Sequence, residues 1–411
     1  MQYVFRKATF MTIKNKKLCS QNTLIWLCCF VYTLAYIGRY SYNANINLIM
    51  NEYSTSHADA GLVTTFFFFA YGIGQVVNGI LCKRYNKKLL FPLVLFGSSV
   101  LNLLILWLPF SFFKYLWVIN GFLQSCLWSS IIHVLGTNLD ADHMDRALAL
   151  TSVTSTVGTF IAYGGSAFFV WLGNYRITFI FAAVMMSLIG VLWLWLFSDA
   201  PIYKPMEKRE QKESKKLGGV MIVLITLAFF AVIDNLVKDG VNTWMPTLLA
   251  ENYGMKDETS ILSSVVLPIL GTFGALLSLK LNRLIKDFVA LIVTMLAVSS
   301  LFLCIVLFFE VSSAVIAVMC FGILACMMSG INNVITSIAP LKMRDKVDSG
   351  RMAGILNGFC YMGSTVSAYG LGAIADRGGW DAAFYLLLGA CAVGIVIGAV
   401  YIICAKIKKT A

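Results

Sequence analysis

The sequence predicts an all-α integral membrane protein whose twelve transmembrane helices form two six-helix bundles, with both termini in the cytoplasm. Its 411 residues are 59% hydrophobic and only 13% charged, whereas soluble proteins carry about 25% charged residues. Twelve apolar runs are long enough to cross the ~30 Å hydrocarbon core of a bilayer. These spans must be helical, because lipid offers no hydrogen-bond partners to an open backbone.

Six of the apolar runs lie in the first half of the chain, and short polar turns separate them. They cover residues 24–48, 59–82, 89–109, 115–137, 147–171 and 177–197. The second half holds the other six, at 219–249, 259–280, 288–309, 313–338, 352–374 and 382–404. An even number of spans places both termini on one side of the membrane.

The basic residues are distributed unevenly between the two sides. Of the 32 lysines and arginines, 26 fall in the tails and in alternate loops on one side, and only 4 fall in the other loops. Cytoplasmic loops carry such an excess, so the termini are assigned to the cytoplasm. The net charge of +12 therefore faces anionic lipid headgroups, and we predict no nucleic-acid partner.

A polar, charged segment separates the sixth span from the seventh. Residues 199–218, within "SDAPIYKPMEKREQKESKKLGG", are predicted to form a cytoplasmic linker. The chain then divides into a first six-helix bundle with its cytoplasmic tail at 1–198, the linker, and a second bundle at 219–411.

Two matching turns indicate that the halves are repeats. "GILCKRYNKKLL" follows the second span and "GALLSLKLNRLIKD" follows the eighth, and each places a glycine before a basic cluster. The residues of the first turn motif are Gly79, Lys83, Arg84, Asn86, Lys87 and Lys88. Two six-helix halves with a basic turn after the second span are typical of the major facilitator architecture.

Three ionisable residues lie deep within predicted spans: Arg39, Asp234 and Lys238, with Asp239 beside them. Each costs ~2.5–3.5 kcal/mol on insertion scales and should face a cavity or a partner. Arg39 and Lys238 occupy the first span of their respective halves, so we predict that they converge on a central cavity and bind an anionic substrate. Arginine offers a planar fork to phosphate or carboxylate, and lysine offers a point charge. Snorkelling to the headgroups or hydrogen bonding to helix carbonyls is the alternative for both.

Asp234 precedes Lys238 by four residues, so the two share a helix face. One interpretation is a neutralising ion pair within the helix. The other is a proton or counter-ion site that releases Lys238 when the substrate arrives. The sequence leaves both open, and Asp234 is assigned a coupling or charge-balancing role.

Polar aromatic residues follow the helical repeat around Arg39. Tyr32 and Tyr36 precede it by seven and three residues, Tyr40 continues the stripe, and Tyr71 and Gln75 repeat the pattern on the second span. Such a face suits a hydrated, sugar-like ligand, so Tyr32, Tyr36, Tyr71 and Gln75 join the predicted binding residues. Anchoring at the lipid–water interface is the competing explanation.

Five stretches resemble the organophosphate:phosphate antiporter family of the major facilitator superfamily. They are "YTLAYIGR", "AYGIGQVVNGILCKRYNKKLLFP", "NGFLQSCLW", "LVKDGVNTWMP" and "GRMAGILNGFCYMGSTVSAYGLGAIADRGGWDAAF". The resemblance covers most of the chain. It implies twelve helices that alternate between inward and outward openings around one site, and it implies an essential arginine at Arg39 and a second basic residue at Lys238.

The chain departs from the family pattern at several positions. Lys238 replaces the family's second arginine, Gln75 replaces a basic residue of the second helix, Ser155 matches a histidine known in some members, and Lys83 replaces the aspartate of the turn. With Asp234 included, the site carries about one positive charge, where the family carries two or more. A monoanion such as a carboxylated or sulfonated sugar becomes a credible ligand.

The function predicted is secondary transport of a small organic anion, favouring an organophosphate exchanged for phosphate. Proton-coupled symport of a monoanionic sugar acid, carboxylate or sulfonate is the alternative, and a membrane sensor for a phosphorylated sugar is the alternative from another class. No nucleophile elbow, P-loop or dinucleotide fingerprint occurs, and the three histidines lack metal-ligand spacing, so we predict no enzyme, cofactor or metal site. We expect a multi-pass protein of the cell membrane that functions as a monomer.

Overall fold

The computed structural model describes residues 20–81, 84–197, 217–308, 313–343 and 349–410. These residues form helices joined by short turns, with no β-strand among them. Eleven of the helices are long and apolar enough to cross a membrane. The all-α membrane fold predicted from the sequence is therefore confirmed.

The helices of the first half match the predicted spans to within a few residues. They are α2 (Gln21–Ala44), α3 (Ile46–Tyr53), α4 (His57–Leu81), α5 (Lys87–Leu104), η2 (Phe110–Phe112), α6 (Phe113–Asn138), α7 (Ala141–Trp171) and α8 (Ile177–Leu196). The first predicted span thus consists of α2 and the short α3, which meet at Asn45.

The second half follows the same plan, but two of its predicted spans are divided into shorter helices. Its helices are α9 (Leu217–Tyr253), α10 (Asp257–Ser264), α11 (Val266–Leu284), α12 (Phe288–Phe308), α13 (Ala314–Asn333), η3 (Val334–Ile338), α14 (Ala339–Lys342) and α15 (Ser349–Thr410). The predicted eighth span comprises α10 and α11, and the tenth comprises α13, η3 and α14. Of the predicted linker 199–218, residues 199–216 lie outside the described part of the chain, as does the tail before Ser20.

Two predicted spans lie within α15, which is bent at Gly379. This glycine has φ 70° and ψ −179°, a backbone conformation that is essentially restricted to glycine. The bend turns the chain back at the end of the eleventh crossing, and the twelfth crossing follows it. Gly379 therefore explains why eleven helices account for twelve spans.

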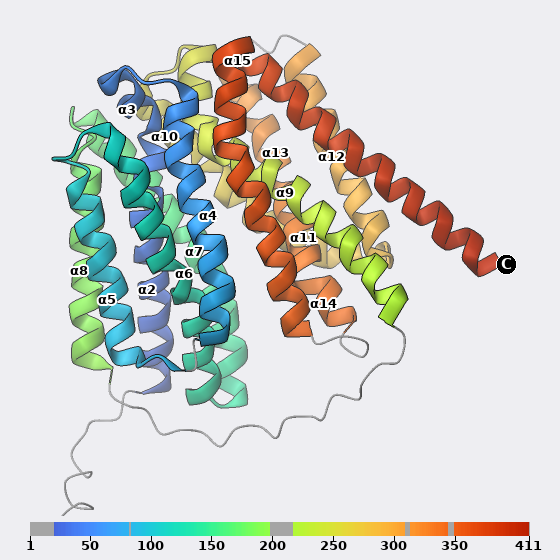
Figure 1. The fold of residues 1–411 in the computed structure, drawn as a ribbon, viewed down its shortest axis with the longest axis horizontal. Coiled ribbons are helices and arrows are strands. Elements are labelled where there is room, and N and C mark those ends of the chain that lie inside the picture. Colours follow the sequence, from blue (N-terminus) through green and yellow to red (C-terminus); the bar gives the residue numbers. More distant parts are fainter. Residues whose placement is uncertain (1–19, 82–83, 198–216, 309–312, 344–348, 411) are drawn as a thin grey trace, which may run out of the picture.

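The two halves lie side by side, with α2–α8 on one side of the molecule and most of the second half on the other, while α10 lies beside the first half (Figure 1). Equivalent helix pairs pack closely in each half. A Cβ atom at Gly158 of α7 would lie 2.4 Å from the carbonyl oxygen of Thr33 on α2, and one at Gly363 of α15 would lie 2.2 Å from that of Val232 on α9. The first and fifth spans of each half thus touch through a glycine, which supports the predicted repeat.

The turns after the second span of each half also match. Asn86 accepts a hydrogen bond from the backbone N–H of Lys88 at 3.0 Å and caps α5. Asp287 accepts from the N–H groups of Val289 and Ala290 at 2.8 and 3.0 Å and caps α12. A side-chain oxygen at this position satisfies donors that a helix start leaves free.

The remaining residues of the predicted turn motif have different surroundings. Arg84 is exposed, the Lys87 ammonium lies 5.4 Å from the centroid of the Tyr85 ring, and Lys88 is partly buried. Lys83 lies outside the described residues, and Gly79 lies near the end of α4.

Asp140 caps α7 at the predicted cytoplasmic end of the first half. It accepts hydrogen bonds from the backbone N–H and from Nδ1 of His143, at 2.9 and 2.7 Å. These donors hold the pKa of Asp140 below its ordinary value.

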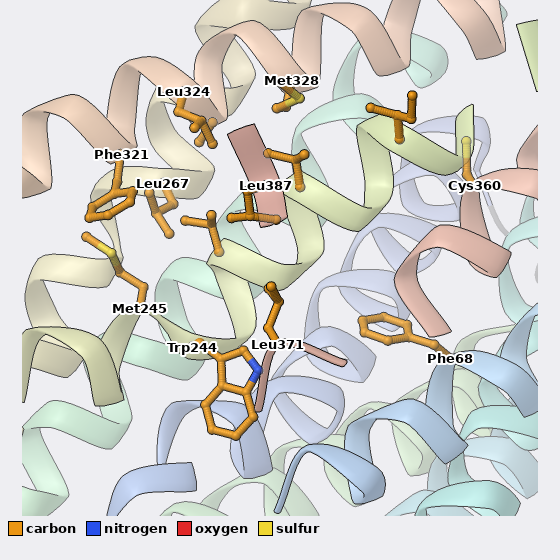
Figure 2. Close-up of a cluster of buried hydrophobic side chains, with 14 of the residues drawn as sticks. Phe68, Trp244, Met245, Leu267, Phe321, Leu324, Met328, Cys360, Leu371 and Leu387 are labelled. Carbon is orange, nitrogen blue, oxygen red and sulfur yellow. The ribbon is translucent and has the colours of Figure 1, made fainter. Parts of the chain in front are cut away.

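The second bundle is held together by a core of large apolar side chains. Phe321 of α13 lies beside Met245 of α9, Trp244 of α9 lies beside Leu371 of α15, and Leu324 and Met328 of α13 belong to the same cluster (Figure 2). The Trp244 indole donates to the carbonyl of Ala368 on α15 at 2.9 Å, which satisfies the polar atom of a side chain that is almost fully buried. Many large apolar side chains on the periphery are exposed, as expected where lipid is the solvent.

Candidate functional site

A cavity of about 490 Å³ lies between the two bundles. Residues of α2 and α7 line it from the first half, and residues of α9, α11, α13 and α15 line it from the second. Arg39 and Lys238 both line this cavity. The predicted convergence of the two cations on one central space is therefore present in the structure.

Arg39 is enclosed by aromatic rings. The guanidinium carbon lies 4.5–5.6 Å from the ring centroids of five residues, which are Tyr36, Tyr40, Phe67, Phe68 and Tyr71. The side chain is 6% exposed, and its Nε has no hydrogen-bond partner. In the described part of the chain the guanidinium forms no ion pair with a carboxylate. Ring faces attract a cation but leave its N–H donors free, so Arg39 can donate to an anion.

Lys238 has polar partners on its own helix. Its Nζ donates to Oδ1 of Asn235 at 2.8 Å and lies 3.8 Å from Oδ1 of Asp239. Because a carboxylate already lies beside the ammonium, Lys238 presents less positive charge to the cavity than Arg39 does.

Asp234 does not form the ion pair with Lys238 that the spacing suggested. Its Oδ2 accepts hydrogen bonds from Asn235 and from Asn332 of α13, both at 3.2 Å, and its Oδ1 is buried without a partner. The acidic partner of Lys238 is instead Asp239. The i,i+4 spacing permits the pair, but the Asp234 side chain is directed toward α13, where an amide donor is available.

Of the predicted polar stripe, Tyr36 and Tyr40 line the cavity beside Arg39. Tyr32 lies behind Tyr36, with hydroxyl oxygens 3.5 Å apart, and packs on Trp128. Tyr71 lies against the guanidinium and accepts a hydrogen bond from Gln75 at 3.1 Å.

A chain of hydrogen bonds continues from Gln75 to the second bundle. Asn357 of α15 donates to Oε1 of Gln75 at 2.6 Å. Tyr32, Tyr71 and Gln75 thus surround and orient the cavity-lining residues, and their part in binding remains a prediction.

Sequence reasoning missed the amide side chains of the second bundle. Five asparagines line the cavity, at Asn235, Asn242, Asn332, Asn333 and Asn357. Each stands within an apolar run, which is the signal that could have identified them, because an amide placed in lipid is costly. Tyr361 and Asp239, which also line the cavity, were not assigned to the binding site.

A π-helix lies directly beside these asparagines. Residues Val334–Ile338 leave the α-helical repeat immediately after Asn333. Asn333 donates to the carbonyl of Ala275 and to Oγ of Ser278 on α11, at 3.1 and 2.9 Å. Such bulges are frequent at functional sites, and this one widens the turn at the cavity wall.

At the opposite end of the molecule from the basic turns, a polar cluster joins the bundles. His57 Nδ1 of α4 lies 2.6 Å from Oδ1 of Asp376 on α15, and Nε2 lies 2.9 Å from Oε1 of Glu251 on α9. Asp376 also accepts from the backbone N–H groups of His57 and Ala58, at 3.0 and 2.8 Å. These contacts close this end between the bundles, which the distribution of basic residues predicts to be the outer end.

A second contact lies on the same side, where Asn47 of α3 donates to Asp257 of α10 at 2.6 Å.

Among the described residues no cluster of three or more metal-ligating side chains was found. The site is therefore built from two cations, one carboxylate, amides, hydroxyls and aromatic rings.

The chain is similar in sequence and in structure to known membrane proteins. The sequence profile of the Major Facilitator Superfamily matches residues 28–347. The membrane sensor protein UhpC of Escherichia coli (strain K12) is 24% identical over 397 residues, covering 88% of this chain and 87% of the relative. The glycerol-3-phosphate transporter of Bacillus subtilis (strain 168) is 23% identical over 406 residues, covering 88% and 89%.

A more distant relative and two solved structures are also similar. The sugar phosphate exchanger 3 of Gallus gallus is 23% identical over 385 residues, covering 80% of this chain and 76% of the relative. A bacterial homologue of the human lysosomal transporter Spinster, in an inward-facing and occupied conformation, superposes with a TM-score of 0.75 at 15% identity, covering 94% and 96%. A D-xylose–proton symporter gives a TM-score of 0.70 at 12% identity, covering 92% and 97%.

Proposed function

The chain belongs to the Major Facilitator Superfamily, and on that premise we propose that it moves a small organic anion across the membrane by alternating access, exchanging an organophosphate for phosphate. The fold is that of a transporter and not of an enzyme. The resemblance to organophosphate:phosphate antiporters is confirmed by relatives that include a glycerol-3-phosphate transporter and a sugar phosphate exchanger.

The observation that carries the proposal is the guanidinium of Arg39, whose Nε has no hydrogen-bond partner and which has no carboxylate partner among the described residues, in the same cavity as Lys238. A buried arginine without a carboxylate retains donors in the planar arrangement that phosphate and carboxylate oxygens accept. An anion that enters this cavity would meet one cation from each bundle. It would thereby link the two halves whose relative movement transports it.

The contacts between the bundles support an inward-facing state. The cluster around His57 and the Asn47–Asp257 hydrogen bond close the outer end. Thr336 and Asn357, which line the cavity, lie near the helix ends that are followed or preceded by the basic segment 342–351. Alternating access requires that the outer contacts break when the substrate is to enter from outside.

Proton coupling is a second candidate, and one observation favours it. Asp234 is 1% exposed, and its Oδ1 has no partner. A buried unpaired carboxylate is costly unless it is neutralised, so a proton on Asp234 would remove that cost. Asp234 would then carry the coupled proton of a symporter.

Proteoliposome transport tests the first candidate. Radiolabelled glycerol phosphate should enter vesicles loaded with phosphate and should not enter empty ones. The relative UhpC is named a membrane sensor, and a chain that binds the ligand without moving it under any gradient would fit that class instead. We propose the cell membrane as the location and the monomer as the functional unit.

Arg39 supplies the decisive variant. Arg39→Lys keeps the charge but loses the fork, and we expect it to lower exchange at least tenfold, roughly the effect of losing one charge-assisted hydrogen bond. Arg84→Lys, at the exposed turn, is the matched control and should exchange like the wild type. Wild-type exchange by Arg39→Ala would contradict the role of Arg39.

A further inference from the structure

We propose that Asp239 determines the class of ligand: the cavity selects an anion that carries a single negative charge and bears hydroxyl groups. This inference rests on the proposed function, because it assigns a charge state and a chemistry to the ligand of the same site. Under it, an organophosphate binds as its monoanion.

The contacts of Asp239 define its chemistry. Its Oδ2 accepts a hydrogen bond from Oγ of Ser364 on α15 at 2.5 Å, and its Oδ1 lies 3.8 Å from Nζ of Lys238. Both partners stabilise a negatively charged carboxylate. Asp239 is 8% exposed, and that small exposure is toward the cavity, which it lines.

The charges that line the cavity are unequal. Among the described residues that line it, the charged ones are Arg39, Lys238 and Asp239. Their sum is one positive charge, and the negative member lies beside Lys238. A ligand with one negative charge neutralises the cavity. A dianion would leave a net negative charge and would bring its second charge toward Asp239 in a low-dielectric space, where repulsion is strong.

The same arrangement of side chains favours a ligand that bears hydroxyl groups. A carboxylate is an acceptor only, so its free lone pairs require a donor. The asparagines of the second bundle offer both donors and acceptors, and hydroxyls are added by Thr156 and Thr159 of α7 and by Thr272 of α11. An anion held at Arg39 with hydroxyls directed at Asp239 would match both sides of the cavity.

Other ionisable groups surround this carboxylate. On α9 they are Lys238 and Asp234, on α2 they are Arg39, Tyr36 and Tyr40, and on α15 they are Cys360 and Tyr361. Asp234 does not line the cavity. The test therefore varies the charge of the ligand, and a ligand whose charge is the same at both pH values is the control for titration of the protein.

Calorimetric binding to the full chain in detergent provides the test. A phosphate monoester loses its second proton with a pKa of about 6. Between about pH 5.5 and pH 7.5 its monoanion therefore falls roughly 25-fold, and the affinity of the wild type for glycerol phosphate should fall by the same factor. Dihydroxypropanesulfonate, which has one charge at both pH values, should bind with unchanged affinity. Propanesulfonate, which lacks the hydroxyls, should bind about tenfold more weakly.

Variants of Asp239 and Ser364 distinguish the effect of charge on ligand affinity from the effect of packing. Asp239→Asn removes the negative charge, and the affinity for glycerol phosphate should then fall less than about threefold over the same range, because the cavity holds two positive charges and accepts the dianion. Ser364→Ala removes a hydrogen bond of Asp239 but no charge, and should keep the wild-type pH profile. Asp239→Glu restores the charge and should behave likewise.

The outcomes distinguish this inference from the proposed function. Equal affinity of the wild type for glycerol phosphate at both pH values overturns the charge selection, and leaves organophosphate binding in place. An unchanged pH profile in a folded Asp239→Asn also overturns it. Binding of the sulfonate alone would overturn the organophosphate assignment and support the single charge. If neither compound binds, the proposed function fails.

Discussion

His57 is the central residue of the outer closure, and replacing it with alanine should shift the protein toward an outward-open state. The imidazole contacts carboxylates from two helices of the opposite bundle, Glu251 on α9 and Asp376 on α15. Both ring nitrogens face carboxylate oxygens, so the doubly protonated ring can donate to each of them. Alanine removes both side-chain contacts, but the backbone N–H groups that Asp376 accepts are retained.

The free energy that the two contacts of His57 contribute follows from the solvent exposure of the side chains. A hydrogen bond to a charged group contributes ~1.5–3 kcal/mol when buried, and an exposed ion pair contributes ~0–1 kcal/mol. The side chains of His57, Glu251 and Asp376 are 18%, 36% and 24% exposed, so we assign each contact about 1 kcal/mol, between those limits. Losing both changes the balance of inward-facing and outward-open states by about 2 kcal/mol, or roughly 30-fold.

A thiol in the cavity reports the change. Ser155 lines the cavity, and Ser155→Cys places a reactive group there. An impermeant thiosulfonate added outside right-side-out vesicles should label this cysteine slowly in the otherwise unaltered chain. It should label it about 30-fold faster once His57→Ala is added, as long as opening limits the reaction.

Asp59→Ala is the matched control, because Asp59 lies in the same first turn of α4 and its partner, Ser56, belongs to its own bundle. We expect no change in labelling for that variant. If His57→Ala labels at the rate of the control, the cluster does not hold the outer end closed and the reasoning is refuted.

Two further predictions concern packing and coupling. Gly363→Ala would place a Cβ 2.2 Å from the carbonyl oxygen of Val232, so we expect a loss of about 1–3 kcal/mol of stability and a lower melting temperature in detergent. Gly354→Ala in the same helix meets nothing within 4 Å and should be neutral or stabilising; equal melting temperatures would exclude a close contact. For Asp234→Asn, we expect abolished pH-driven accumulation and intact counterflow if Asp234 carries a coupled proton. Retention of both activities would remove Asp234 from coupling, and loss of both in a folded variant would indicate a structural role.

Much of the architecture was predictable because lipid restricts the choices. A span needs about 20 apolar residues and must be helical, so the apolar runs located the helices to within a few residues. The interruptions were not predictable in this way. The break at Asn45, the π-helix after Asn333 and the division between α10 and α11 depend on local packing, which leaves mean hydropathy unchanged.

The candidate site was predictable where a basic residue interrupted an apolar run. Arg39 and Lys238 were identified as candidate binding residues in this way, because a charged side chain within a membrane span is costly and usually faces a partner or a cavity. Asp239 was noted but given no role, and the asparagines of the second bundle were not assigned to the site. An amide in a span can pack against a neighbouring helix as readily as it can line a cavity.

By itself, the sequence determined the membrane class and the places of the apolar helices, and it predicted the orientation of the spans and the two cations that a ligand could meet. These follow from composition and spacing, which the bilayer converts directly into structure. Only the tertiary structure decided which groups meet. It turned Asp234 toward Asn332 instead of Lys238, placed Asp239 beside the ammonium, and set His57 between Glu251 and Asp376. Spacing along a helix defines which face a side chain shares, but the neighbouring helix provides the partner that fixes its direction.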